Sequence, residues 1–408
     1  MKNVRNLAAA ALAALVALAT TSAAAQKNYD PGASDTTVRI GQTGPTGTWG
    51  AIGQTMQAYF RMVNEKGGIN GRKIELITYD DAYDAAKTSE VTRKAVETDK
   101  VLFMSGSIGT GTQLAVAPYL NQLKVPQLFM ASPSGNLAAA KKFPYSMMAM
   151  PSYESEGAIW LRHLTATKPK AKVAVLYQND EMGHATLNGF KQDLEKTRLQ
   201  IVSEQPYSLT EPSIDAQINA MKASGADTVL LITTQKMTVM ALQKIRGLAW
   251  SNPTIYLSQG GSSIKTALTP AGLDNAKRVI VVAARMSIHD VAYANHPDMQ
   301  AYLAFIAQYM PGTNGADDDQ YLWGYSTAAL TAHVIEQAGN NLTRENILKI
   351  ATSLRDYHAP LLLPGVTLNS SPTDYRLFQS MQIRQFDGKI FEPLGPVLSI
   401  HWMRSGKL

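Results

Sequence analysis

Two loops in the first third of the chain combine hydroxyl groups and glycines in a way that suits anion binding. Residues 106–112 read Gly-Ser-Ile-Gly-Thr-Gly-Thr, and residues 131–136 read Ala-Ser-Pro-Ser-Gly-Asn. Each follows a short apolar run, and the first opens a helical pattern whose free N–H groups and dipole favour an anion. Glycine lets a ligand approach the backbone closely. We predict a carboxylate site formed by the hydroxyls of Ser107, Thr110, Ser132 and Ser134 and the amides of Gly109 and Gly135, with Ile108 inside the first loop. The simpler alternative is that both loops are capped turns.

The same residues come close to a hydrolase motif. Residues 105–109 resemble the G-x-S-x-G nucleophile pattern, but Ser105 stands where the first glycine belongs and no histidine is placed by sequence to serve it. A serine hydrolase is therefore kept as the alternative enzyme class. The chain has no G-x-G-x-x-G, phosphate-binding P-loop or H-E-x-x-H motif, so nucleotide and zinc chemistry lack their usual groups.

The acidic run Asp317-Asp318-Asp319 is a candidate metal site. The residues after it lack the glycine and the distal glutamate of a calcium loop, so we predict a solvated helix start instead. The chain contains no cysteine, which excludes disulfides, thiolate metal sites and a cysteine nucleophile. We assign no metal and no cofactor.

Short strand-like runs alternate with longer helical patterns along the chain. In the first part, strands are expected at residues 37–42, 73–79, 101–105 and 127–130, with helices at 50–64, 85–98 and 112–123. This βαβα order is typical of a parallel sheet covered by helices. Ligands of such sheets bind outside the carboxyl ends of the strands, which is where the two hydroxyl-rich loops begin.

The alternation restarts after Pro151. Strands are expected at 172–177, 199–203, 228–232, 254–257 and 278–282, and helices at 154–166, 185–197, 214–223 and 236–247. Helices at 296–309, 320–338 and 343–354 follow, and a polar tail carries strand-like segments at 381–386 and 397–401. Two successive α/β halves imply a cleft between them.

The N-terminus is typical of a secretory signal peptide. Lys2 and Arg5 precede an apolar run over residues 7–19 that ends at Ala23-Ala24-Ala25. That run is shorter than the roughly 20 apolar residues that span a bilayer. We predict that residues 1–25 are removed and that the mature chain, starting at Gln26, is exported to the periplasm.

Length and composition fit two lobes of ordinary packing. The chain has 408 residues, of which 45% are apolar, against a usual domain size of about 100 to 200 residues. Its formal charge of +6 is scattered, with no basic run longer than Lys141-Lys142, so nucleic-acid binding is not supported.

Several short motifs along the chain together identify a protein family. They are I-G-x-T-G-P at residues 40–45, N-E-K-G-G-I-N-G-R-K-I-E-L at 64–76, Tyr-Asp-Asp at 79–81, Gly-Ser at 106–107, Val-Pro at 125–126, Ala-Ser-Pro at 131–133, Gly-Tyr at 324–325 and Ala-Gly at 338–339. On these motifs, nearly the whole mature chain resembles the periplasmic solute-binding proteins of the branched-chain amino-acid type, which serve ABC importers. The resemblance implies a two-lobed type I fold, each lobe a parallel-sheet α/β sandwich, joined by a three-segment hinge. It places the first lobe at 36–151 plus 284–358 and the second at 152–283 plus 359–408.

The sequence departs from this family in the residues that would hold an α-amino acid. The resemblance implies an acid after a second-lobe strand, but residues 256–262 contain none, and Met182 stands where the family places a tyrosine. A buried ammonium without a charged partner costs several kcal/mol, so an amino acid is disfavoured unless Asp180 or Glu181 supplies the charge. Met182 adds a polarizable surface that suits flat apolar groups.

Four further side chains are predicted to line the cleft. Trp49 would form a wall for an aromatic ring or simply pack, and Gln235 and Gln259 would reach the ligand from the second lobe. Arg285, at an expected crossing between the lobes, offers a bidentate partner for a second acid or polar substituent, with a rim salt bridge as its alternative.

We therefore predict a non-enzymatic, monomeric periplasmic receptor that closes on a small aromatic or apolar carboxylate and delivers it to an ABC permease of the inner membrane. A branched-chain or other neutral amino acid is the alternative ligand.

Overall fold

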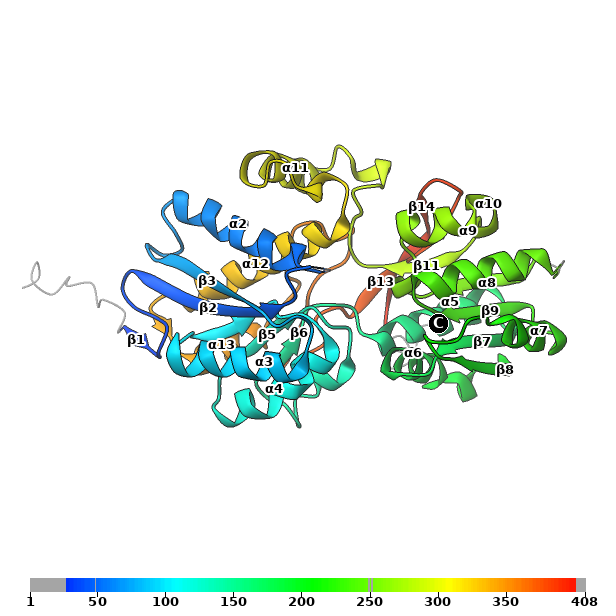
Figure 1. Cartoon of the computed structure of the whole chain (residues 1–408), viewed down its shortest axis with the longest axis horizontal. Helices are drawn as coiled ribbons and strands as arrows, with labels where there is room; N and C mark the ends of the chain where they lie inside the picture. Colours follow the sequence, from blue (N-terminus) through cyan, green and yellow to red (C-terminus); the bar gives the residue numbers. More distant parts are fainter. Residues whose placement is uncertain (1–26, 48, 249, 251, 401–408) are drawn as a thin grey trace, which may run out of the picture.

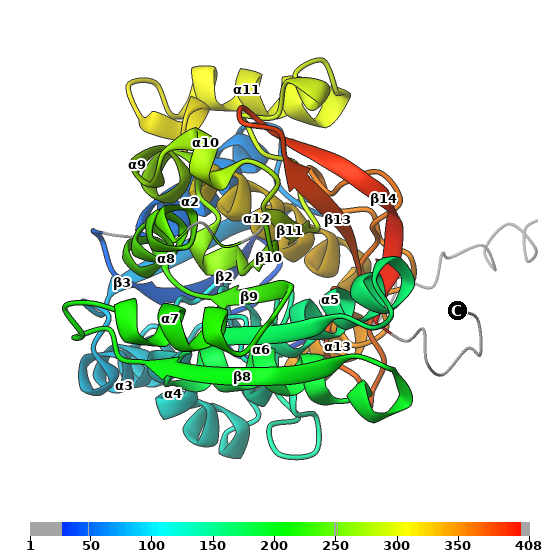
Figure 2. The ribbon, with the colours of Figure 1, turned by 90° about the vertical axis from the view of Figure 1, so that its right-hand side faces the viewer.

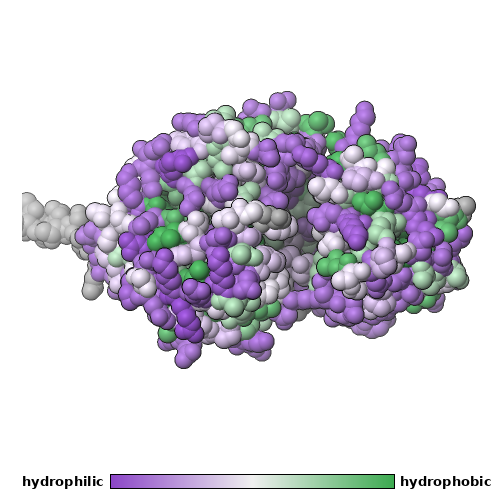
Figure 3. Space-filling view, in the orientation of Figure 1, coloured by the Kyte–Doolittle hydropathy of each residue, from purple (hydrophilic) through white to green (hydrophobic). Residues whose placement is uncertain are grey.

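The computed structural model describes residues 27–400, apart from residues 48, 249 and 251. The predicted export segment, residues 1–25, lies outside the described residues. Two lobes lie side by side along the longest axis, each with a sheet covered by helices (Figure 1). The predicted two-lobed α/β architecture is confirmed. In the space-filling view, the surface is hollowed between the lobes (Figure 3).

The first lobe is built on a parallel sheet. Its elements in chain order are β2 (Thr37–Gly44), α2 (Ala51–Glu65), β3 (Lys73–Asp80), α3 (Ala85–Arg93), β4 (Phe103–Ser105), α4 (Thr110–Gln122), β5 (Gln127–Met130) and β6 (Ser146–Met148). Within the described residues this sheet has five strands, in the order β3-β2-β4-β5-β6. The sequence pattern misses β6, because three buried residues are too few to show a period.

The second lobe has a mixed sheet. Its elements are α5 (Tyr153–Thr167), β7 (Lys172–Gln178), α6 (Glu181–Lys191), β8 (Gln200–Tyr207), α7 (Asp215–Ala223), β9 (Thr228–Ile232), α8 (Gln235–Gly247), β10 (Thr254–Leu257), α9 (Thr269–Ala271), α10 (Leu273–Ala276), β11 (Ile280–Ala283), β13 (Ser380–Phe386) and β14 (Phe391–Ser399). Across the described chain the strand order is β14-β13-β11-β10-β9-β7-β8. Every residue of β9 is buried, as expected for a central parallel strand. The two tail strands run antiparallel to their neighbours and close one end of the sheet (Figure 2).

Residues after β11 return to the first lobe. Here the elements are α11 (Pro297–Tyr309), α12 (Asp319–Ala338) and α13 (Arg344–Ala351), and β1 (Asn28–Tyr29) pairs with β12 (Asn341–Leu342). Helix α12 packs closely across α2, because a Cβ on Gly324 would lie 2.6 Å from the carbonyl oxygen of Ile52. The Tyr325 ring on α12 packs edge-on against Tyr59, with centroids 5.1 Å apart. This contact fixes α12 in the first-lobe core.

Short helical turns fill several connections. The 3-10 turns are Gly135–Ala138, Leu194–Lys196, Gln259–Gly261, Val291–Tyr293 and Asn314–Ala316, and the π-helical turns are Lys94–Thr98 and Ile264–Leu268. The turn at Lys94–Thr98 continues α3, so the helix predicted over 85–98 changes its winding in its last part.

The connections between the lobes run close together. The segment after β11 pairs with residues 361–363, since the N–H of Met286 bonds to the carbonyl of Leu361 at 2.9 Å and that of Leu363 to Ala284 at 3.0 Å. The later segment stays against the first lobe for some length, because the Tyr375 hydroxyl donates to the carbonyl of Pro144 at 3.0 Å.

No helix among the described residues is long and apolar enough to cross a membrane. Strand β14 is exposed along most of its length and contains Pro393 and Pro396.

Candidate ligand-binding cleft

The loop after β4 uses much of its polar chemistry to hold the sheet together. The Ser107 hydroxyl is buried and accepts the N–H of Thr43 at 3.1 Å, which joins the ends of β4 and β2. The Gly109 N–H donates to the carbonyl of Ala131 at 3.2 Å. The prediction of a free Gly109 amide is therefore wrong, because the neighbouring strand end already takes that donor. Ile108 is buried and forms a parallel bridge with the same Ala131.

Thr110 and Ser132 are the predicted site residues that the fold brings together most directly. Their hydroxyl oxygens lie 2.8 Å apart, although the residues belong to different loops. Thr110 is the first residue of α4, and no side chain caps that helix. The hydroxyl pair thus lies at a helix N-terminus, where uncapped N–H groups and the dipole favour an anion.

The loop after β5 makes contact with the second lobe. The Ser134 hydroxyl donates to the Glu181 Oε1 atom, and the Asn136 amide donates to the same oxygen at 3.0 Å. Glu181 is the first residue of α6. A Cβ on Gly135 would lie 2.7 Å from both carboxylate oxygens of Glu154, so a larger residue there would have to displace that side chain. Two carboxylates of the second lobe therefore surround the loop predicted to bind a ligand carboxylate.

Two acidic residues of the second lobe were not predicted as site residues. Burial raises the pKa of Glu154, and its Oε2 atom has no hydrogen-bond partner among the described residues. Burial raises the pKa of Glu156 to about 8, and its Oε1 atom accepts the N–H of Gln259 at 2.9 Å. Both lie in the first turn of α5, where acids also stabilise the helix dipole. Because acids are common at this position, the sequence gives no sign that these two face the predicted site.

Asp180 has a different task. Its Oδ1 atom accepts the Gly183 N–H at 3.1 Å and caps α6. Of the two acids left open as substitutes for the missing ammonium partner, only Glu181 makes hydrogen bonds with the first lobe in the described structure.

Two tyrosines flank the loops, and the sequence analysis missed both. Tyr83 is 53% exposed, and its backbone lies in the left-handed region with a φ of 60°. Its ring is so close to Gly109 that a Cβ there would lie 2.8 Å from a ring carbon. The left-handed backbone of Tyr83 costs energy, and such strain is often found at functional sites.

The second tyrosine is Tyr153. Burial raises the pKa of Tyr153, and the charges of Asp180 and Glu181 add to this effect.

The remaining predicted wall residues are placed less closely. The Met182 sulfur would lie 3.4 Å from a Cβ on Gly260, so Met182 lies against the turn that contains Gln259. Gln235 is exposed at the start of α8. Trp49 is 39% exposed with a φ of 73°, so it does not pack in the core. No hydrogen bond or ring contact within the described residues joins Trp49 or Gln235 to the Thr110–Ser132 pair.

Arg285 is buried, at 8% exposure, beside the connection between the lobes. Its guanidinium carbon lies 4.3 Å from the Trp323 ring centroid and 5.2 Å from that of Phe378. The alternative of a rim salt bridge is wrong, because the side chain is buried and pairs with no carboxylate in the described part of the chain.

The acidic run before α12 divides its roles. Asp317 pairs with Lys265 of the second lobe at 2.8 Å, and Asp318 caps α12. Asp319 is half-buried and accepts the Ser287 hydroxyl at 2.8 Å, so the predicted solvated helix start holds for the exposed Asp317 but not for Asp319. No group of side chains suited to a metal ion occurs among the described residues.

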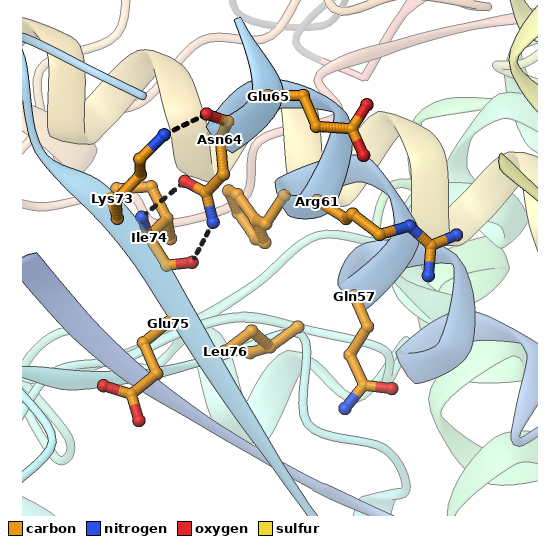
Figure 4. Close-up of a pocket in the computed structure, with 9 residues that line it drawn as sticks. Gln57, Arg61, Asn64, Glu65, Lys73, Ile74, Glu75 and Leu76 are labelled. Atoms are coloured by element: carbon orange, nitrogen blue, oxygen red, sulfur yellow. Dashed lines mark hydrogen bonds between the residues drawn. The ribbon is translucent and has the colours of Figure 1, made fainter. Parts of the chain in front are cut away.

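A separate groove lies at the far end of the first sheet. It has a volume of about 600 Å³ and lies between α2 and the beginning of β3 (Figure 4). Asn64 bonds to both backbone groups of Ile74 at 2.8 Å, and the Glu75 carboxylate pairs with Arg39. Because the groove lies opposite the carboxyl ends of the strands and its polar side chains already have partners, we do not assign the ligand to it.

Two α/β lobes around a hollow, with polar loops at the strand ends, define a two-lobed binding protein. Residues 38–389 match the periplasmic binding protein family, and the chain belongs to that family. The resemblance seen in the sequence motifs is thereby confirmed.

Solved structures share this fold at low identity. A branched-chain amino acid ABC transporter protein from Thermus thermophilus with bound valine has a TM-score of 0.76 at 19% identity, over 92% of this chain and 100% of its own. A solute binding protein from R. palustris in complex with 4-hydroxybenzoate has a TM-score of 0.71 at 19% identity, over 89% and 97% of the two chains.

The curated relatives match over a shorter region. Leu/Ile/Val-binding protein homolog 7 of Brucella abortus is 23% identical over 222 residues, which are 52% of this chain and 55% of the relative. The chain thus spans about half the length of the curated relatives it matches.

Proposed function

We propose that this chain is the periplasmic receptor of an ABC importer and that it closes its lobes on a small organic acid with an aromatic or similarly apolar body. The observation that carries the proposal is the Thr110–Ser132 hydroxyl pair, 2.8 Å apart at the uncapped start of α4. Hydroxyls and free N–H groups at a helix N-terminus suit a carboxylate. The apolar body would lie among Tyr83, Tyr153 and Met182.

The serines of the hydrolase alternative, Ser105 and Ser107, use their hydroxyls for other hydrogen bonds, which favours a binding protein over an enzyme. The Ser105 hydroxyl bonds to that of Thr331 at 2.8 Å, and the Ser107 hydroxyl accepts a backbone N–H. Neither hydroxyl bonds to a histidine within the described residues, so neither has the base that a serine nucleophile requires.

A neutral amino acid is the second candidate, and one observation favours it. Glu181 places a carboxylate beside the first-lobe loops, and Glu154 adds a carboxylate oxygen without a partner in the described structure. Together these groups would bind the ligand ammonium in place of the acid that amino-acid binders of the family use and that this chain lacks.

Matched pairs of ligands separate the two candidates. Thermal unfolding and titration calorimetry would compare phenylalanine with 3-phenylpropionate, leucine with 4-methylpentanoate, and benzoate with 4-hydroxybenzoate. Ligand at 100 times its Kd stabilises a folded protein by about 2.7 kcal/mol. We expect the deaminated acids to bind more tightly and to be recovered unchanged. Binding of the amino acids alone would replace our proposal with the second candidate, and turnover of a bound acid would refute the receptor function.

A further inference from the structure

Arg285 is a buried cation whose partner is missing. Its Nε and Nη1 atoms are buried and have no hydrogen-bond partner among the described residues. Burial lowers the pKa of Arg285 from 12.5 to about 9, so the side chain stays charged at neutral pH. An unpaired buried charge is costly, and proteins normally supply its partner.

A second buried arginine shows what such a partner looks like. Arg384, on β13, also lies near an aromatic ring, that of Tyr293 at 5.6 Å. It pairs with the carboxylate of Asp290, and both side chains are almost fully buried. Arg285 has the same aromatic surroundings, formed by Trp323 and Phe378, but lacks the carboxylate.

The position of Arg285 connects it to the cleft. It follows β11 and forms a bridge with Leu362 of the later inter-lobe segment. Phe378, against its guanidinium, comes two residues after Arg376. Arg376 is near enough to Glu154 for its charge to act on that carboxyl, and the Glu154 carboxylate lies beside Gly135 of the predicted carboxylate loop. Arg285 therefore lies on the connection between the lobes, beside a segment that extends toward the acids of the second lobe.

We propose that Arg285 binds a second carboxylate of the ligand, so that the preferred solutes are dicarboxylic acids whose first carboxylate lies at Thr110 and Ser132. The inference rests on the proposed function and narrows its ligand class. Two aromatic rings hold the guanidinium plane, and its side-on and end-on forks each contain one of the two unpartnered nitrogens. A carboxylate on either fork would therefore satisfy a buried donor by a charge-assisted bond.

Calorimetry with acids of equal length tests the second carboxylate. The probes are hexanoate against adipate and 4-methylbenzoate against terephthalate. We expect each diacid to bind the natural protein about ten- to hundred-fold more tightly than its monoacid, as for a hydrogen-bonded charge. Arg285→Met should lose this advantage, so that a diacid binds no more tightly than its monoacid, whereas Arg198→Met, which changes an exposed arginine of the second lobe, should keep it.

Two further measurements separate binding from folding. Without ligand, Arg285→Met should melt at the same or a higher temperature than the natural protein, because it removes an unpaired buried charge. If it does not fold, Arg285→Lys keeps the charge without the fork and should lose most of the diacid advantage. Diacids should also change the tryptophan emission of the natural protein more than that of Trp323→Phe.

The outcomes distinguish the inference from the function on which it rests. Monoacids that bind as tightly as diacids, or an Arg285→Met protein that still prefers diacids, would overturn the role of Arg285 while the carboxylate receptor stands. Failure of every acid to bind would overturn both.

Discussion

The two faces of the cleft differ in charge. The first lobe offers neutral hydroxyls and backbone groups, of which the Thr110–Ser132 pair is the most direct example. The second lobe offers carboxyl groups from the first turns of its helices, namely Glu154, Glu181 and the buried Glu156, whose raised pKa of about 8 keeps it protonated near neutral pH. We therefore expect the carboxylate of a ligand to bind first to the neutral face. The acidic face then decides whether the rest of the ligand is apolar or carries an ammonium group.

One contact shows how the faces interact. The Glu181 carboxylate accepts hydrogen bonds from Ser134 and Asn136, in the loop that the sequence assigns to a ligand carboxylate. A ligand anion would have to compete with Glu181 for these donors. The neighbouring Thr110–Ser132 pair has no such competitor among the described contacts, so we expect the two halves of the predicted site to behave differently.

The largest effect should come from the buried acid Glu156. Because the pKa of Glu156 is about 8 in the folded protein and near 4.5 when unfolded, only the folded state keeps the proton between these values. The free energy of unfolding should therefore fall by about 1.4 kcal/mol per pH unit as the pH rises through this window. Denaturant unfolding between pH 4.5 and 8.5 should show this slope, and Glu156→Gln should remove it. Glu90→Gln, an exposed change, should not, and an unaltered slope in Glu156→Gln would contradict the buried neutral acid.

Next in size is the neutral face. Thr110→Val should weaken carboxylate binding by about 1.5 to 3 kcal/mol, because it removes a hydroxyl bonded to a charged group. Ser107→Ala should instead lower the free energy of unfolding by about 1 kcal/mol and leave affinity unchanged, since that hydroxyl holds the Thr43 backbone. Calorimetry and denaturant unfolding of both variants check the contrast. The reverse pattern would move the site to Ser107.

A smaller effect should distinguish the two candidate ligand classes. Glu181→Gln removes the competing charge, so carboxylate ligands should bind about three- to ten-fold more tightly, as expected for one like charge near the surface. The gain should shrink at high salt. Glu195→Gln, at an exposed position of the same lobe, is the control. Weaker binding of amino acids to the Glu181 variant would identify this residue as the ammonium partner.

The smallest effect should come from the exposed ion pair between Lys265 and Asp317. Lys265 and Asp317 join the two lobes at 2.8 Å, but both side chains are exposed. Exposed ion pairs contribute little, so Lys265→Ala should change ligand affinity by less than about three-fold. Titration at low and high salt would measure this, and a larger change would mean that the pair helps to close the lobes.

The sequence predicted the regular features well because they depend on local patterns. The largely apolar run of β9 and the glycine- and hydroxyl-rich loops after β4 and β5 are visible without tertiary information. The direction in which each hydroxyl points is not, since Ser107 turns toward Thr43 and Ser134 toward Glu181. Those choices depend on strands and helices that are distant in sequence.

The acidic face was hidden for a related reason. Glu154 and Glu156 follow the capping residue Ser152, and acids in a first helical turn need no functional explanation. Their importance emerges only when the fold places Gly135 and Gln259 against them. Arg285 was predicted as a site residue, but its burial without a partner could not be read from sequence.

The second-lobe sheet ends, within the described chain, in the exposed strand β14. Open edges of this kind template the addition of foreign strands, which is a common first step of aggregation. Pro393 and Pro396 have no N–H to donate, and Gly395 between them has a φ of 144°, which interrupts the regular pleat. A strand approaching this edge would find two donors absent within four residues. We therefore expect the backbone chemistry of β14 to oppose polymerisation of the protein through that edge.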